Sequence, residues 1–357
     1  MTRIYGSPSR YVQGAGALDD MASFLAPLGQ RALLVADQPV LDLIERRVAA
    51  VCATQGIECQ SLVFSGEITP EEIERLGGLA RATSAQFVMA AGGGKGIDAG
   101  KGVAHRLGVP VVTLPTAASN DAPTSKLFVL YDHNHRVLRV EHMTSNPALV
   151  VVDTQVIAAA PARLFTAGIG DAIVKKFEVA QAIGAGGPNL FGGQATLTAQ
   201  ALADLCYTTI RAKGEAALQA VTRKQADAAL EDVVEAAVLH SGLGFESGGL
   251  SVCHAMTRGL SAVRGSRDAL HGHQVAYALL VQLTLEGRAR EFIDDVSAFY
   301  RGLGLPTRLA DLGLADASAD ELRAIAEGTM TAAYIKNFQR PLTAADVAAA
   351  VESVESR

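Results

Sequence analysis

The stretch QFVMAAGGGKGIDAGK, residues 86–101, decides the fold class, because an apolar run leads through three glycines into a helical pattern. We predict a buried strand over 86–94 and a helix that continues to about His105. The glycines would let backbone amides approach a phosphate group at a helix N-terminus, where the helix dipole favours negative charge. Lys95 stands at the mouth of this turn. The spacing matches neither G-x-G-x-x-G nor the P-loop, so a plain tight turn is the alternative.

Similar apolar runs alternate with helical patterns through the first half of the chain. We expect strands at 31–37, 59–64, 109–116 and 148–154, a helix at 39–53, and another that begins at Pro70 behind a Thr69 cap. Such alternation predicts a parallel sheet covered on both faces. Runs at 126–132 and 136–143, with a turn at 133–135, predict a hairpin laid on that sheet. Asp37 ends the first run, where open parallel sheets bind nucleotides, and is placed to accept from a ribose or adenine edge.

The character of the chain changes after residue 153, where segments rich in alanine and leucine replace the Val and Ile clusters. Ser318 begins a capping box, and Thr343 is a second helix cap. We therefore expect an α/β nucleotide-binding domain with a parallel sheet over residues 1–158. An all-α, metal- and substrate-binding domain would follow over 159–357, with the site in the cleft between the two.

Composition limits the classes of function. The chain has 357 residues, 49% of them hydrophobic and 19% charged, which is typical of a globular protein with room for two cores. A net charge of −6 without a basic tract argues against nucleic acid or an anionic membrane as a partner. Four cysteines without a C-x-x-C pair favour reduced thiols. With no apolar leader or membrane span in the sequence, we expect a cytoplasmic protein.

Three of the eight histidines fall within SGLGFESGGLSVCHAMTRGLSAVRGSRDALHGHQV, residues 241–275. His254 lies in an apolar run that predicts a buried helix, and His271 opens a second such run. Asp171 lies in FTAGIGDAIVKKFE, residues 165–178, and we expect it at the start of a helix. Two imidazoles and a carboxylate suit zinc or ferrous iron with open positions for a substrate. Ordinary core histidines, and an N-cap role for Asp171, are the alternatives.

The segment PTAASNDAPTS, residues 115–125, gathers small hydroxyl side chains around one acid. Thr116, Ser119 and Ser125 can form hydrogen bonds to a cofactor, and Asp121 can accept one from a substrate hydroxyl. A plain polar loop is the alternative.

In these motifs the chain resembles the glycerol dehydrogenases of the metal-dependent, iron-containing alcohol dehydrogenase family. The resemblance extends over nearly the whole chain, through YVQGAGAL, LLVADQPVLDL, GGGKGID, PTAASNDAPTS, NPALVVVDT, GIGDAI, LADLCYTT, GFESGGLSVCHA and HGHQVAYA in this order. It implies NAD- and zinc-dependent oxidation of glycerol or a similar small polyol to the hydroxyketone by hydride transfer. It also implies a homo-oligomer, between dimer and octamer in size.

The resemblance also implies roles for individual residues. Asp171, His254 and His271 would hold the catalytic zinc, or ferrous iron, and Asp121 would contact the substrate hydroxyl. The predicted NAD contacts are Asp37, Gly93, Gly94, Lys95, Asp98, Thr116, Ser119, Ser125, Leu127 and Tyr131.

Three departures from the family pattern cluster around the predicted metal. His273 stands where the family usually has an acid; it would be a solvated histidine at a helix start, with a proton relay or an extra ligand as the alternatives. Lys175 stands where Thr is usual, and Thr257 and Arg258 replace a His–Asn pair.

Lys175 and Arg258 each follow a predicted metal ligand by four residues and so share its helix face. One hypothesis is therefore that both bind a substrate with an anionic group, such as a 2-hydroxy acid or a phosphorylated polyol. Equally, each would pair with a nearby acid such as Glu178. A lyase of the dehydroquinate synthase type shares fold, NAD and zinc, but its motifs differ from these.

Overall fold

A parallel sheet forms the N-terminal half of the protein. The structure, a computed structural model, describes residues 2–133 and 136–357. Within these residues, six parallel strands pair in the order β1-β8-β5-β4-β2-β3. They are β1 (Tyr11–Gly14), β2 (Arg31–Ala36), β3 (Glu58–Val63), β4 (Phe87–Gly92), β5 (Val111–Pro115) and β8 (Leu149–Asp153). The predicted α/β class with a parallel sheet is confirmed, although β1 was not among the predicted strands.

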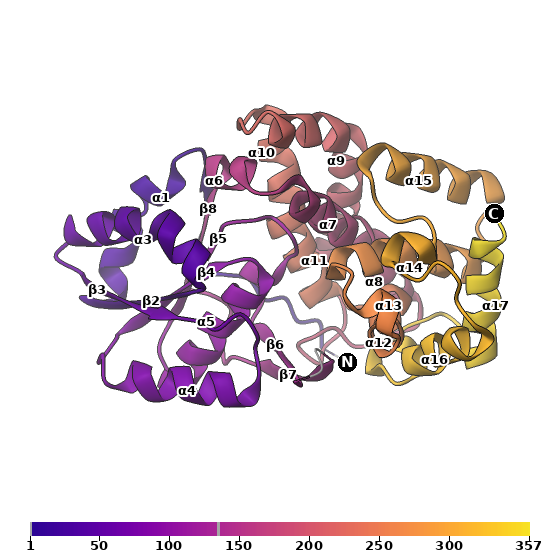
Figure 1. Cartoon of the computed structure of the whole chain (residues 1–357), viewed down its shortest axis with the longest axis horizontal. Coiled ribbons are helices and arrows are strands. Elements are labelled where there is room, and N and C mark those ends of the chain that lie inside the picture. The colour runs from indigo at the N-terminus through magenta and orange to yellow at the C-terminus, as the bar shows by residue number, and fades with distance from the viewer. Residues whose placement is uncertain (1, 134–135) are drawn as a thin grey trace.

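Helices cover both faces of this sheet (Figure 1). The helices of this half are α1 (Ala17–Asp20), α2 (Ala22–Leu25), α3 (Gln38–Ala53), α4 (Pro70–Arg81) and α5 (Gly94–Leu107). Leu34 and Met89 pack with α1 and α3 on one face, while Leu33 and Val88 pack with α4 and α5 on the other. Side chains alternate between the faces of a strand and both faces are covered here, so β4 and the buried residues 32–36 of β2 are apolar throughout.

A hairpin follows β5. Its strands are β6 (Leu127–Tyr131) and β7 (Val137–His142), which pair in antiparallel fashion. The predicted hairpin is therefore confirmed, but residues 134–135 of its predicted turn lie outside the described residues.

The C-terminal half is helical, as predicted, and occupies the other side of the molecule in Figure 1. Its α-helices are α6 (Thr154–Ala159), α7 (Ala162–Ile173), α8 (Lys175–Gly184), α9 (Leu197–Thr222), α10 (Ala228–Glu235), α11 (Ser241–Gly248), α12 (Val252–Ala262), α13 (Arg264–Arg267), α14 (His271–Leu285), α15 (Arg290–Leu303), α16 (Ala319–Met330) and α17 (Ala344–Glu355). Ser318 and Thr343 cap α16 and α17 with capping boxes. The predicted boundary after residue 158 falls at the end of α6, and the division into two domains stays a prediction. Across the described residues, every helix is too short or too polar to cross a membrane.

The predicted place of Asp171 was wrong. It lies in the last turn of α7 rather than at the start of a helix. Gly168 and Gly170 lie inside this helix. A Cβ at Gly168 would lie 1.8 Å from the carbonyl oxygen of Ala118, so this glycine permits close packing and does not end the helix.

Candidate functional site

Asp171, His254 and His271 converge at one point of the helical half. Asp171 comes from the end of α7, His254 from the first turn of α12, and His271 is the first residue of α14. The Oδ1 atom of Asp171 lies 3.2 Å from Nε2 of His254 and 3.8 Å from Nε2 of His271. One donor atom from each residue lies within 4.8 Å of the other two. One carboxylate and two imidazoles at this spacing fit a divalent metal with open coordination positions.

Close backbone packing brings these ligands together. A Cβ at Gly272 would lie 1.8 Å from the carbonyl oxygen of Ala167, so α14 approaches α7 more closely than any side chain would permit. The two helices carry His271 and Asp171, and this contact sets the distance between them.

Replacing Gly272 with alanine is expected to lower the free energy of unfolding by about 1–3 kcal/mol, because the added methyl group meets backbone that cannot move aside easily. Urea denaturation would measure the loss. Gly78 provides a matched control inside α4, since a Cβ there meets nothing within 4 Å. Gly78→Ala should leave stability unchanged or raise it by up to about 1 kcal/mol. Equal effects of the two substitutions would contradict the packing argument.

Glu178 on α8 orients His254, a role that the sequence reasoning missed. Its Oε2 atom lies 2.6 Å from Nδ1 of His254, and its Oε1 atom accepts hydrogen bonds from the backbone N–H groups of His254 and Ser251. Carboxylates that hold the second nitrogen of a histidine ring are typical partners of metal ligands. The sequence did contain a signal for this role, because Glu178 follows Asp171 by seven residues, which is two helical turns.

Negative charge dominates this buried cluster. Burial raises the pKa of Asp121, and the neighbouring charge of Asp171 adds to the rise. Burial also opposes ionisation of Asp171, but Lys175 and His254 outweigh it and keep the pKa of this carboxyl well below its usual range. For His254 burial favours the neutral ring, yet Glu178 outweighs it and raises the pKa to about 9. The cluster therefore stabilises positive charge, whether a proton or a metal ion carries it.

His271 lies at the open side of the cluster, with 44% of its side chain exposed. Partial desolvation of the ring by the surrounding residues lowers its pKa although Asp171 opposes this, so the neutral form that binds metals is favoured. His273 points elsewhere, and its Nε2 atom lies 3.3 Å from the hydroxyl of Thr166. Among the described residues, the group that could hold a metal includes His271 and not His273.

The two basic residues beside the site differ in their partners. Lys175 is fully buried, and its Nζ atom lies 2.8 Å from Asp171 Oδ1 and 3.1 Å from Asp121 Oδ2. Arg258 is half-buried, and its Nε atom is buried without a hydrogen-bond partner within the described part of the chain. Arg258 also acts on Tyr334. Burial raises the pKa of the Tyr334 phenol, and the positive charge of Arg258 opposes this rise.

The predicted NAD residues gather around the first turn of α5. Gly93 is the N-cap of α5 and, as a glycine, has no side chain to cap the amides of the first turn. Asp37 caps α3 by accepting from the N–H of Val40. Lys95 pairs with Glu67 at 2.8 Å and lies over the ring of Tyr131.

The remaining predicted NAD residues lie on α5 and on the segment after β5. The backbone N–H of Thr116 donates to Gly92 at the end of β4. The Ser119 hydroxyl would lie 3.7 Å from a Cβ built at Gly93, and the side chain of Asn120 lies against Gly94. The glycine turn and the segment 116–125 therefore face each other.

Lys101, which was not predicted, joins three of the proposed cofactor residues. Its buried ammonium lies 3.5 Å from Asp98 Oδ1 and donates to the Ser125 hydroxyl and to the carbonyls of Ala122 and Leu127. The distances to the two carbonyls are 2.5 and 2.8 Å. Lys101 thus fixes the path of the chain that leads into β6.

The helical half holds the same segment from the opposite side. The Ser241 hydroxyl donates to Asp121 at 2.6 Å, and Glu246 accepts from the backbone N–H of Lys126 at 2.8 Å. The Thr124 hydroxyl donates to the carbonyl of Val238. Residues 121–127 therefore connect α5 of the sheet half with α11 of the helical half.

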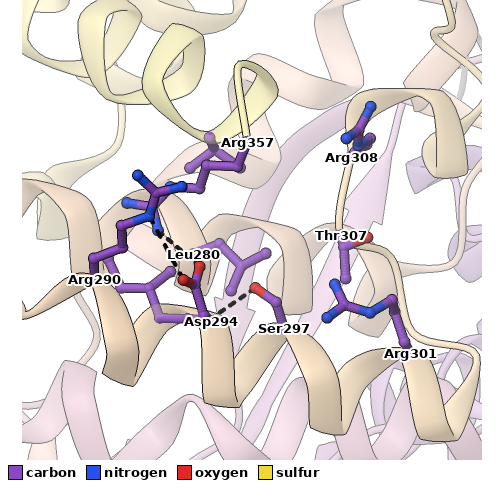
Figure 2. Close-up of a pocket in the computed structure, with 10 residues that line it drawn as sticks. Leu280, Arg290, Asp294, Ser297, Arg301, Thr307, Arg308 and Arg357 are labelled. Carbon is purple, nitrogen blue, oxygen red and sulfur yellow. Dashed lines mark hydrogen bonds and ion pairs between the residues drawn. The ribbon is translucent and has the colours of Figure 1, made fainter.

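A separate cavity lies away from these residues, between α15, the segment after it and the C-terminal end of α17. Figure 2 shows arginine side chains around it, with Asp294 and Ser297 on α15. Its volume is about 250 Å³, and its arginines are Arg290, Arg301, Arg308 and Arg357. It contains none of the predicted site residues.

Comparison with known proteins gives consistent results. Residues 8–154 match the family model described as iron-containing alcohol dehydrogenase. A glycolaldehyde reductase of Halobacterium salinarum is 41% identical over 92% of this chain and 90% of its own. A glycerol dehydrogenase of Thermotoga maritima is 40% identical over 98% of this chain and 95% of its own.

A solved structure agrees with the sequence relatives. The crystal structure of a probable glycerol dehydrogenase from Sinorhizobium meliloti has a TM-score of 0.94 and 35% identity, with 99% of both chains covered. The likeness thus extends over both halves of the chain and includes the candidate site. This protein is an oxidoreductase and belongs to the iron-containing alcohol dehydrogenase family.

Proposed function

We propose that the protein oxidises glycerol or a similar small polyol to the hydroxyketone and transfers the hydride to NAD. The observation that carries the proposal is the convergence of Asp171, His254 and His271 within reach of Asp121. In the balanced reaction the substrate carbon loses a hydride and its hydroxyl loses a proton. NAD accepts the hydride, and the proton leaves the site.

The donor set fits a zinc ion, with ferrous iron as an alternative that accepts similar ligands. Asp171, His254 and His271 would hold the ion. When bound, it would act as a Lewis acid that lowers the pKa of the substrate hydroxyl. Glu178 fixes the ring of His254, and Ser241 orients Asp121 so that its carboxylate can accept from a second hydroxyl of the polyol.

The cofactor proposal is supported by the first turn of α5, where the missing side-chain cap suits a pyrophosphate. Asp37, at the end of β2, would accept from the ribose hydroxyls and repel the 2′-phosphate of NADP. We therefore propose NAD rather than NADP.

An anionic hydroxy compound is a second candidate substrate, and Arg258 favours it. Lys175 already contacts Asp171, Asp121 and His254, so two carboxylates compete with a substrate anion for its ammonium. Arg258 retains a buried Nε atom without a partner among the described residues. A buried donor of this kind is stabilised by an incoming carboxylate or phosphate.

A substrate panel tests both candidates. Purified protein with zinc would be assayed with glycerol, propane-1,2-diol, 2-hydroxy acids and glycerol phosphate, each with NAD and with NADP, by absorbance of the reduced nicotinamide. We expect the highest kcat/KM with glycerol and NAD. A preference for the acids or the phosphate would replace the polyol by the anionic substrate. Turnover without net NADH would instead indicate chemistry of the dehydroquinate synthase type.

Replacing Glu178 with glutamine is expected to weaken zinc binding by about 10–100-fold, because the ring of His254 loses its orienting carboxylate. Competition with a chromophoric chelator would measure the dissociation constant. Glu235 offers a control, since it pairs with His240 at 3.3 Å in a histidine–carboxylate pair outside the site. Glu235→Gln should leave zinc affinity unchanged, and an equal loss in both variants would reject the role of Glu178.

A further inference from the structure

Lys175 lies among the proposed metal ligands rather than beside them. It is the first residue of α8 and is fully buried. Its Nζ atom lies 2.8 Å from Asp171 Oδ1, 3.1 Å from His254 Nε2 and 3.1 Å from Asp121 Oδ2. Two carboxylate oxygens and one imidazole nitrogen therefore lie within 3.1 Å of the ammonium.

Two of these three atoms are the ones that a metal ion would use. A zinc ion lies about 2.0–2.2 Å from its oxygen and nitrogen ligands. Any ion that coordinates both Asp171 Oδ1 and His254 Nε2 must therefore come within a few ångström of the ammonium. Positive charges at such a distance repel each other strongly in a buried site, because the surroundings screen them poorly.

The surroundings of Lys175 give its ammonium no route to solvent. The ring of Phe245 lies 5.4 Å from Nζ on another side, and the side chain has no exposed surface. Of the three polar partners named above, Asp121 is the one that is not a proposed metal ligand. When a metal ion binds, the ammonium must withdraw toward Asp121, the residue that we propose to contact the substrate.

We infer that Lys175 is a resident cation of this site. In the metal-free protein it neutralises Asp171 and Asp121 and keeps the ligands assembled, and it weakens the binding of a divalent ion. The inference rests on the ligand set of the proposed function, but it concerns metal affinity and assembly of the site rather than turnover.

The test is a comparison of zinc affinity between the native protein and Lys175→Met, which removes the charge and shortens the unbranched side chain by one atom. Both proteins would be stripped with a chelator and titrated with zinc against a chromophoric competitor. We expect Lys175→Met to bind zinc at least tenfold more tightly. Without metal, its melting temperature should be lower than that of the native protein, because two carboxylates lose their cation. Zinc should then raise that temperature more in the variant.

Two further variants make the result decisive. Lys176 is the next residue, pairs with Asp204 on the surface, and gives a matched control; Lys176→Met should bind zinc like the native protein. Lys175→Gln, which keeps polar atoms at this position, replaces the methionine variant if that one does not fold, with the same expected gain in affinity.

Equal or weaker zinc binding by the folded Lys175 variants would overturn the inference and leave the proposed metal site standing. If neither the native protein nor these variants bind zinc more tightly than His254→Ala, the ligand set itself is wrong. The proposed function and this inference would then both be rejected.

Discussion

Replacing His254 with alanine should lower kcat/KM by about 10³-fold or more, since a bound metal ion stabilises the transition state by several kcal/mol and each 1.4 kcal/mol is tenfold in rate. The variant loses one of three proposed ligands, and Glu178 loses the ring that it orients. Steady-state assays at saturating NAD and zinc would measure the effect. Circular dichroism would check that the helical half remains folded.

His273 is the matched control for this substitution. It belongs to the same stretch of sequence and to the helix that His271 opens, but its ring contacts Thr166 and lies outside the ligand group. His273→Ala should keep kcat/KM within about threefold of the native value, a change of under 1 kcal/mol. Comparable losses in the two variants would contradict the ligand assignment.

Replacing Lys101 with methionine is expected to lower the free energy of unfolding by about 3–5 kcal/mol, because removal of one partner leaves a buried charge without compensation. Asp98 would lose its cation, and the carbonyls of Ala122 and Leu127 would lose their donor. Urea denaturation followed by circular dichroism would measure the change.

Lys95 provides the comparison for Lys101. It pairs with Glu67 on the surface, where an ion pair contributes no more than about 1 kcal/mol. Lys95→Met should therefore have little effect on stability. If Lys101→Met were equally mild, the segment after β5 would not depend on the buried ammonium.

The sequence was sufficient for features that depend on local chemistry. The helix caps at Thr69, Ser318 and Thr343 were predicted from residue type and spacing, and each accepts the expected backbone hydrogen bond. The central strands were predicted because a strand buried on both faces forms a nearly continuous apolar run. β1 was missed, since its four residues are only half-buried at the edge of the sheet and lack such a run.

Features that depend on distant packing were not predictable in the same way. Asp171 was placed at the wrong end of its helix. The helix runs through Gly168 and Gly170, where a Cβ would meet the backbone of Ala118 and Gly272, residues that are distant in the sequence. His254 and His271 could be proposed as ligands from their two apolar runs.

The partners of Lys175 show the limit of spacing arguments. Spacing of four residues placed its side chain on the face of Asp171. It gave no reason to expect that Asp121, fifty-odd residues earlier, would complete the contacts of the ammonium. Helix geometry predicts the direction of the Lys175 side chain. Its contact with Asp121 depends instead on how the two halves of the molecule pack against each other.

The anchoring of residues 121–127 has a mechanical consequence. Lys101 holds this segment from the sheet side, and Ser241 and Glu246 hold it from the helical side. A segment tied in this way cannot serve as a free hinge, because any opening of the two halves must break buried polar contacts on one side. The distance between the nicotinamide that we propose on the sheet side and a substrate hydroxyl beside Asp171, His254 and His271 would then be set by the protein before either molecule binds.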